Sequence, residues 1–231
     1  MSRPHFVVVH GGNGTGPQME PLAAALRPYG EVHSPNLPGH GGRSIPESFS
    51  IKGHAEDLAA WLDAQGVEHA HFFGYSVGGY VGLYLARHMP ARTLGVCAIA
   101  AKYVFDASTV ERWTRISSEA WMRKPGNPRA AEMEKIHVPQ DWIALVKVNA
   151  ALYRDLGREA PLKDADLAAI ATPVMLVGSN RDQLVPWPET LALGALIPGS
   201  KLVMFYGRAH PIAAVPCGSV AKAYSDWLKI A

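Results

Sequence analysis

Apolar residues along this chain fall into short unbroken runs, separated by longer stretches in which they recur every three or four positions. Short runs rich in β-branched and aromatic residues are typical of buried strands. Such runs lie at residues 5–10, 31–34, 69–74, 94–100, 173–178 and 201–206. The pattern therefore predicts a sheet of about six strands.

The stretches between these runs have the spacing of amphipathic helices. Leu22 and Leu26 lie one turn apart before Gly30, and apolar residues from Ile51 to Leu62 follow a possible N-cap at Ser50. A third helix is predicted over residues 77–88 and a last one over about 216–230. Regular alternation of strand and helix predicts an α/β fold, a mostly parallel sheet with helices on both faces.

Residues 103–165 interrupt this alternation, because they contain no strand-like run. We predict a small helical cap insertion there, with residues 1–102 and 166–231 forming the core domain. The tryptophans of the insertion can form its own small core or line an apolar pocket. We take Trp113, Trp121 and Trp142 as candidate substrate-binding residues.

Composition narrows the class of protein. The 231 residues carry 22 basic and 20 acidic side chains, well mixed, so no nucleic-acid footprint is present. The first apolar run is too short for a signal peptide or a membrane span, which predicts a soluble cytoplasmic protein without a membrane partner. Cys97 and Cys217 lie in unlike settings and are expected to be buried and unpaired. The oligomeric state is left open.

Ser76 has the most informative surroundings in the chain. It lies between Gly74 and Gly78, directly after the strand at 69–74 and directly before the helix at 77–88. A very tight strand-to-helix turn requires small residues two positions away on each side of the serine, and it projects the hydroxyl above the helix N-terminus. The motif therefore predicts a nucleophile, and the alternative is a packing turn with an idle serine.

A nucleophilic serine needs a base and a carboxylate that orients it. His210 follows the last strand through a short loop and has the best position, although His10 and His40 also lie near strand ends. For the carboxylate we favour Asp182, four residues after Gly178, over Asp106. A zinc site at His69 and His71 finds no third ligand nearby in the sequence, so no metal is expected.

The chain resembles the α/β-hydrolases over nearly its full length outside the insertion. The resemblance rests on the serine between two glycines and on the order Ser76, Asp182, His210 along the chain. In the loop VVVHGGNGTG the resemblance implies an oxyanion hole formed by the N–H of Gly12, or of Asn13, with that of Val77. Asn36 stands where the family usually has an aspartate. The chain starts almost at the first parallel strand, so a shortened N-terminus is expected.

This resemblance implies a serine hydrolase that cleaves a carboxylic ester of a small, largely apolar substrate through an acyl-enzyme, without a cofactor. Thioesters, lactones, amides and carbon–carbon bonds are open to the same triad, and a non-catalytic binding protein or cofactor-free oxidative chemistry is a further alternative. Asn13 and Tyr75 flank the expected site and are assigned to substrate binding. Lys102 and Arg181 are cations that could pair with a substrate carboxylate. A dinucleotide loop is disfavoured, because Pro17 stands where a glycine is needed.

Overall fold

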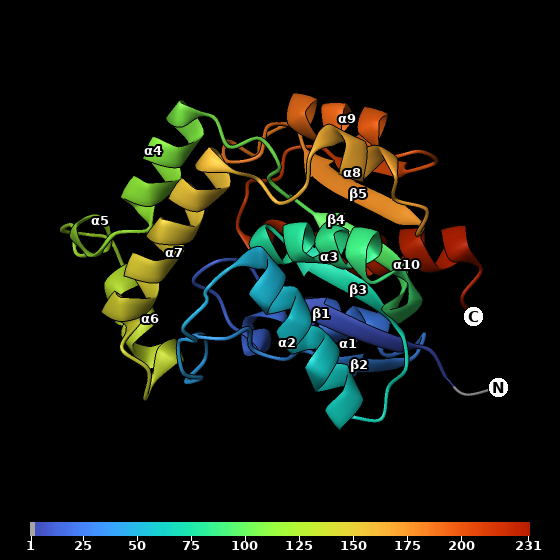
Figure 1. The fold of residues 1–231 in the computed structure, drawn as a ribbon, viewed down its shortest axis with the longest axis horizontal. Coiled ribbons are helices and arrows are strands. Elements are labelled where there is room, and N and C mark those ends of the chain that lie inside the picture. Colours follow the sequence, from blue (N-terminus) through green and yellow to red (C-terminus); the bar gives the residue numbers. More distant parts are fainter. Residues whose placement is uncertain (1–2) are drawn as a thin grey trace.

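The computed structural model describes residues 3–231 and contains one six-stranded parallel sheet (Figure 1). The strand order is β2-β1-β3-β4-β5-β6, and every neighbouring pair is parallel. The prediction of about six parallel strands is confirmed, with each boundary within one residue. The strands are β1 (His5–Val9), β2 (Glu31–His33), β3 (Ala70–Tyr75), β4 (Thr93–Ile99), β5 (Val174–Ser179) and β6 (Lys201–Phe205).

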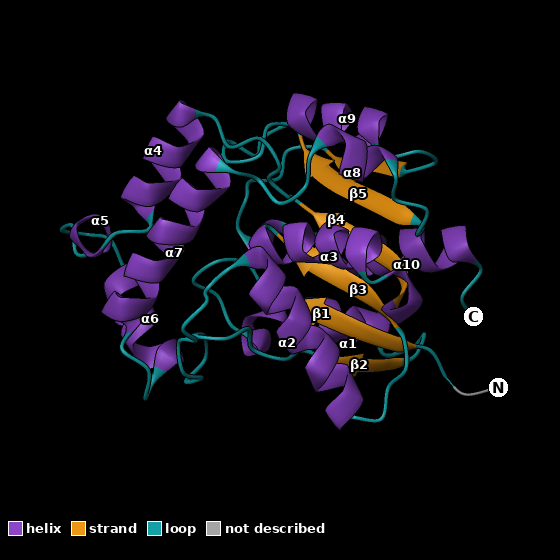
Figure 2. Ribbon diagram, in the orientation of Figure 1, coloured by secondary structure: helices purple, strands orange, loops and turns teal. Residues whose placement is uncertain are grey.

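Helices cover both faces of the sheet, as predicted (Figure 2). One buried cluster joins β1 and β3 to α1 (Glu20–Leu26) and α10 (Cys217–Leu228). A second cluster on the other face joins the sheet to α2 (Ile51–Ala64) and α3 (Val77–His88). Alternate strand residues point to opposite faces, so Phe6 and Val8 enter the first cluster and Val7 and Val9 the second.

The α9 helix (Trp187–Leu196) did not emerge from the sequence pattern. It begins beside two prolines, at positions 186 and 188, and contains Gly194, all of which usually argue against a helix interior. The prolines are tolerated because they precede the helix or lie in its first turn, where N–H groups have no intrahelical partner. Leu193 then packs into the same cluster as α2 and α3.

Between β4 and β5 the chain forms a separate group of helices, beyond the carboxyl ends of the strands at the left of Figure 1. We use the name cap for residues 103–165. The cap helices are α4 (Ala107–Ile116), α5 (Glu119–Met122), α6 (Arg129–His137) and α7 (Trp142–Arg158). Within the cap, α4 packs against α7, and α5, α6 and α7 share a small apolar cluster of their own. The remaining elements of the chain are η1 (Gly16–Met19), η2 (Pro90–Arg92), α8 (Asp164–Ala168) and η3 (Ile212–Ala214).

Within residues 3–231, none of the helices has the length and apolar character needed to cross a bilayer. Both cysteines, Cys97 and Cys217, are buried and unpaired, which confirms that prediction.

Candidate active site

Ser76 occupies a strained turn between β3 and α3. Its backbone angles, φ 53° and ψ −116°, lie outside the regions that a residue with a side chain favours. The flanking positions must be glycine because a side chain would collide with the backbone. A Cβ at Gly74 would lie 2.1 Å from the Gly78 oxygen, and a Cβ at Gly78 would lie 2.5 Å from the Val9 oxygen. Strand and helix can therefore approach each other only because these positions have no side chain.

Asp182 and His210 meet at the same edge of the sheet. The His210 Nδ1 and the Asp182 Oδ2 are 2.7 Å apart, and the Asp182 side chain is almost fully buried. The other carboxylate oxygen accepts hydrogen bonds from the N–H groups of Leu184 (2.8 Å) and Val185 (2.9 Å). These bonds fix the carboxylate, so that it can hold the imidazole in one orientation.

The loop that carries His210 is tied to the end of β5. The Arg208 N–H donates to Ser179 Oγ at 3.0 Å, and the Gly207 N–H donates to Asn180 Oδ1 at 2.7 Å. On the other side, the Tyr75 hydroxyl donates to the His210 carbonyl oxygen at 2.7 Å. Tyr75 precedes Ser76, so this bond brings the histidine loop to the serine turn.

Within residues 3–231, no hydrogen bond of 3.5 Å or less joins Ser76 Oγ to His210. In substrate-free enzymes the bond between nucleophile and base is often long, and it tightens only when substrate is bound. The structure thus brings Asp182 and His210 into contact and ties the His210 loop to Tyr75, the residue before Ser76, without a formed Ser76–His210 bond.

The loop after β1 packs against the serine turn. A Cβ at Gly11 would lie 3.2 Å from Ser76 Cβ, and a Cβ at Gly12 would lie 3.4 Å from Val77 Cγ2. Within residues 3–231, neither the Gly12 N–H nor the Val77 N–H has a protein acceptor. Val77 is the first residue of α3, where backbone N–H groups favour negative charge. The two N–H groups are therefore free to bind an anionic oxygen.

Tyr153 of α7 brings a cap hydroxyl to this loop, a contact that the sequence did not predict. A Cβ at Gly12 would lie 2.4 Å from the Tyr153 Oη. Tyr153 is buried, and burial raises the pKa of its hydroxyl to about 12, so the group stays protonated at neutral pH. Its ring packs edge-on against Trp113, at 5.1 Å between centroids, and Trp113 lies 6.3 Å from the His210 ring.

Asn13 anchors the same loop to the cap and is one of the few residues with positive φ other than glycine (58°). Its side chain donates to Ser117 Oγ at 3.2 Å and accepts from Asn149 Nδ2 at 3.0 Å. The Asn149 Oδ1 is buried without a partner within residues 3–231. The polar Asn149 lies four residues from Leu145 and from Tyr153 on the buried side of α7, and this break in an apolar pattern was the available sequence signal.

Four buried histidines lie behind the loop. His10, His40, His54 and His137 come from four separate segments, and the rings of His10 and His40 are 4.8 Å apart. Burial lowers the pKa of His10 to about 3 and that of His54 to about 4, and it also lowers the pKa values of His40 and His137. All four are therefore neutral at pH 7. His10 accepts a hydrogen bond from the Leu37 N–H at 3.0 Å, so its ring has a structural role, and His210 remains the candidate base.

Two predicted substrate-binding residues lie elsewhere. Trp142 is buried in the apolar cluster of the cap, with Arg123 stacked on its ring at 5.1 Å, and Trp121 packs against the same cluster. Both residues therefore contribute to the small apolar core of the cap, and their role in substrate binding stays a prediction. Trp113, by contrast, lies beside Tyr153 and His210.

Three other residues singled out in the sequence, Asp106, Lys102 and Asn36, have structural partners. Asp106 is exposed and caps α4 through the Thr109 N–H at 2.7 Å, so it does not replace Asp182 beside His210. Lys102 is buried in an ion pair with Glu189 and is not the free surface cation expected from the sequence. Asn36 accepts from the Gly16 N–H at 2.7 Å and so anchors the loops at this edge.

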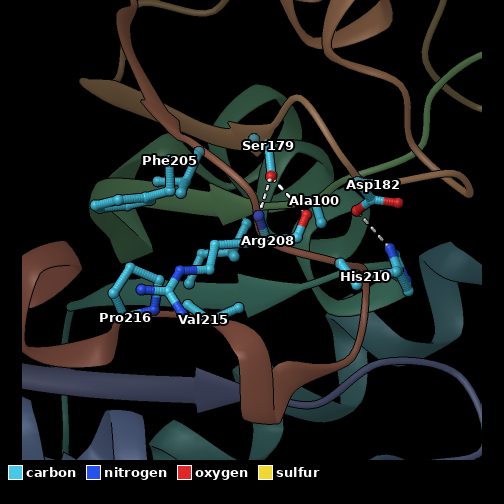
Figure 3. Close-up of a pocket in the computed structure, with 12 residues that line it drawn as sticks. Ala100, Ser179, Asp182, Phe205, Arg208, His210, Val215 and Pro216 are labelled. Carbon is cyan, nitrogen blue, oxygen red and sulfur yellow. Dashed lines mark hydrogen bonds and ion pairs between the residues drawn. The ribbon is translucent and has the colours of Figure 1, made fainter.

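A small cavity of about 20 Å³ lies on the Asp182 side of His210, between the ends of β4, β5 and β6 (Figure 3). Its lining is mostly apolar and includes Val177, Phe205 and Val215, with the Asp182–His210 pair at one end. Such a volume holds about one water molecule, so the cavity is too small to be the substrate site.

Comparison with known proteins agrees with this geometry. Residues 6–223 match the alpha/beta hydrolase family. A protein of Azorhizobium caulinodans named "Putative carbamate hydrolase RutD" is 30% identical over 231 residues, covering 88% of this chain and 83% of the relative. A pimeloyl-acyl-carrier-protein methyl ester esterase of Vibrio campbellii is 24% identical and covers 90% of this chain and 87% of the relative. Among solved structures, NosK from Streptomyces actuosus superposes with a TM-score of 0.82 at 21% identity, covering 99% of both chains.

The parallel sheet, the strained serine turn and the histidine–aspartate pair at the strand ends define the class of α/β enzymes built around a nucleophile elbow. The chain belongs to the alpha/beta hydrolase family.

Proposed function

We propose that this protein is a serine hydrolase that cleaves a carboxylic ester, or a related acyl bond, of a small and largely apolar substrate. Ser76 attacks the carbonyl carbon, His210 takes the hydroxyl proton and returns it to the leaving group, and Asp182 holds the imidazole. The Gly12 and Val77 N–H groups bind the developing oxyanion. Water then attacks the acyl carbon while His210 accepts one of its protons; the bond to Ser76 breaks, His210 gives that proton to the Ser76 oxygen, and the acyl group leaves as a carboxylic acid.

The observation that carries the proposal is the convergence of three features at one edge of the sheet. These are the strained Ser76 turn, the Asp182–His210 contact of 2.7 Å, and two unpaired N–H groups beside the serine. The Val77 N–H would lack an acceptor at the start of any helix, so the unpaired Gly12 N–H, which lies in a loop, is the feature that a packing turn with an idle serine does not explain.

The surroundings of Gly12 favour a short acyl group. Tyr153 lies against this glycine, Trp113 packs on Tyr153, and Ser76 itself is only 4% exposed. Little room is left beside the proposed oxyanion hole, so a long acyl chain would have to displace cap side chains. We therefore infer that hydrolysis is fastest for acetyl-sized or slightly longer acyl groups and falls as the acyl chain lengthens.

The direct test is hydrolysis of a graded series of aryl esters, with matched thioesters, lactones and carbamates, by the wild type, Ser76→Ala and His210→Ala. Both variants should lose the activity by about 10⁴-fold or more. A fluorophosphonate probe should label the wild type once per chain and leave Ser76→Ala unlabelled. Equal rates for the three proteins would refute the assignment, and an unlabelled wild type would favour a binding protein that kept the hydrolase fold.

A further inference from the structure

A group of metal-ligating side chains lies at the other end of the sheet from Ser76. His5 opens β1, Glu31 opens β2, and His33 ends β2. These two strands are parallel, with His5 paired to Glu31 and Val7 paired to His33. The loop with Gly12 follows the carboxyl end of β1, so this group and the proposed active site lie at opposite ends of one strand.

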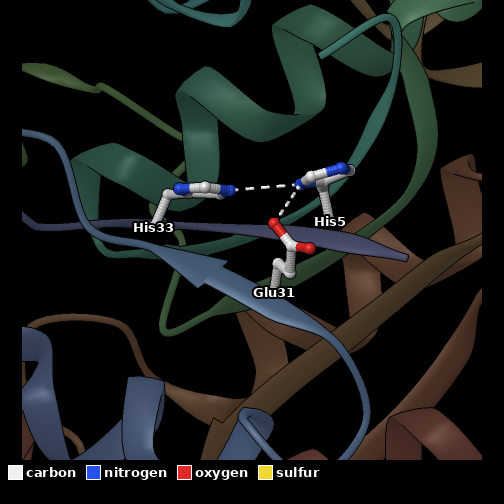
Figure 4. A group of neighbouring side chains, drawn as sticks. All are labelled: His5, Glu31 and His33. Atoms are coloured by element: carbon white, nitrogen blue, oxygen red, sulfur yellow. Dashed lines mark hydrogen bonds and ion pairs between the residues drawn. The ribbon is translucent and has the colours of Figure 1, made fainter. Parts of the chain in front are cut away.

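All three side chains point to the same face of the sheet. Glu31 and His33 are two residues apart and therefore share a face, and His5 lies opposite Glu31 in the register. The His33 ring packs edge-on against Trp61 of α2, at 5.1 Å between centroids, so the shared face is the one that α2 covers. Figure 4 shows the two imidazoles and the carboxylate turned toward one another.

The spacing of the donor atoms matches a metal site. His5 Nδ1 lies 3.2 Å from His33 Nε2 and 3.7 Å from Glu31 Oε2, and one ligand atom from each residue falls within 4.8 Å of the others. Ligands bound tetrahedrally at about 2.0 to 2.1 Å from an ion are separated by roughly 3.3 Å from one another. A single ion can thus reach all three donors with only small side-chain movements.

We infer that His5, Glu31 and His33 form a binding site for a divalent transition-metal ion of the Zn²⁺ type, which fastens the edge strand β2 to β1. Two imidazoles and one carboxylate suit Zn²⁺, Cu²⁺ or Ni²⁺, whereas Ca²⁺ and Mg²⁺ take oxygen ligands. The Glu31 side chain is 58% exposed, so an ion can enter from solvent and water can complete its coordination.

The state of the imidazoles is compatible with this role. A metal-bound imidazole must give up the proton on its ligating nitrogen. Partial burial and the neighbouring His5 lower the pKa of His33, so this ring is neutral at pH 7. Without an ion the contact between His5 and His33 is a hydrogen bond between two rings that lie nearly parallel, 19° apart. If the group is a metal site, an added ion should raise the stability of the chain; if it is only a hydrogen-bonded pair of rings, an added ion should not.

The experiment uses the full chain without a histidine tag, stripped of metal with EDTA and returned to EDTA-free buffer. Calorimetric titration with ZnCl₂ should give one ion per chain. At a Zn²⁺ concentration about 100 times Kd, the unfolding temperature should rise by about 5 to 10 °C. MgCl₂ at the same concentration should leave it unchanged.

Three variants separate this site from adventitious binding. His33→Gln should abolish the Zn²⁺-dependent shift, and Glu31→Gln, an exposed position where the fold is not at risk, should weaken binding about tenfold. His88→Gln removes an exposed histidine outside the group and should behave as wild type. Absence of any shift in the wild type, or a shift that survives both His33→Gln and Glu31→Gln, would overturn the inference. The result does not depend on Ser76, so it stands or falls separately from the proposed hydrolase activity.

Discussion

At the scale of single residues, the sequence offers two aspartates as the carboxylate that orients His210, and their contacts in the structure differ. Asp182 holds His210, whereas Asp106 is the exposed N-cap of α4. We expect Asp182→Asn to lower kcat for ester hydrolysis by about 10⁴-fold, because the amide favours the wrong imidazole tautomer. Asp106→Asn is the matched control, since asparagine is also a good N-cap, and it should leave kcat unchanged. A larger loss in Asp106→Asn than in Asp182→Asn would contradict the assignment.

The second residue-scale prediction concerns Tyr153. Its protonated hydroxyl lies against Gly12, where it can donate to the carbonyl end of a bound substrate. Loss of one such hydrogen bond corresponds to about tenfold, so we expect Tyr153→Phe to lower kcat/KM by about that factor. Tyr84→Phe, on α3 beside His88, is the control. If both variants retain full kcat/KM, the Tyr153 hydroxyl does not act on the substrate.

At the scale of elements, the turn from β3 to α3 depends on the absence of a side chain at Gly78. Gly78 and Gly218 are each the second residue of a helix, α3 and α10, but a Cβ at Gly218 would meet nothing within 4 Å. Gly218→Ala should raise the free energy of unfolding by about 0.5 to 1 kcal/mol. Gly78→Ala should lower it by about 2 kcal/mol or more, because the methyl group would collide with the backbone of β1. Urea unfolding of the two variants measures this difference, and similar values would show that the turn can relax.

The strands and α3 were predictable because their signals are local. A buried strand or a glycine-fenced serine is specified within a few residues. Tyr153 and the four buried histidines could not be predicted, because the contact of Tyr153 with Gly12 joins segments far apart in the chain and no short pattern encodes it. The role of Trp142 could not be settled from the sequence for a related reason, because the small core of a cap and an apolar pocket need the same residue types.

At the scale of the whole molecule, buried polar contacts join the cap to the core beside the loop that carries Gly12. The Gly41 N–H donates to His137 of α6 at 3.0 Å, and Asn149 of α7 donates to Asn13 at 3.0 Å. Both hydrogen bonds join uncharged groups, the neutral imidazole of His137 in the first and two side-chain amides in the second. Protonation of the histidines behind the loop would place charges in a buried, crowded site, so the stability of the folded chain is linked to pH.

The sign of this linkage follows from the lowered pKa values of His10, about 3, and His54, about 4, against an ordinary value of 6.5. Above pH 6.5 both histidines are neutral whether the chain is folded or unfolded, and they contribute no pH dependence. As the pH falls from 6.5 toward 4, the unfolded chain binds protons that the folded chain excludes. The free energy of unfolding should therefore fall by up to about 1.4 kcal/mol per pH unit for each of the two histidines.

One substitution tests this linkage. His54 is buried beside Phe49, and its Nε2 has no hydrogen-bond partner within residues 3–231, so a leucine of similar size removes a titrating group without breaking a bond. The charges that act on it are the neighbouring Arg43 and Asp57, which form an ion pair with each other. Urea unfolding of His54→Leu should lose about 1 kcal/mol per pH unit of the slope between pH 6 and 4.5. The control variant His88→Gln, at an exposed histidine, should keep the wild-type slope. An unchanged slope in His54→Leu would mean that burial of this imidazole does not limit stability in acid.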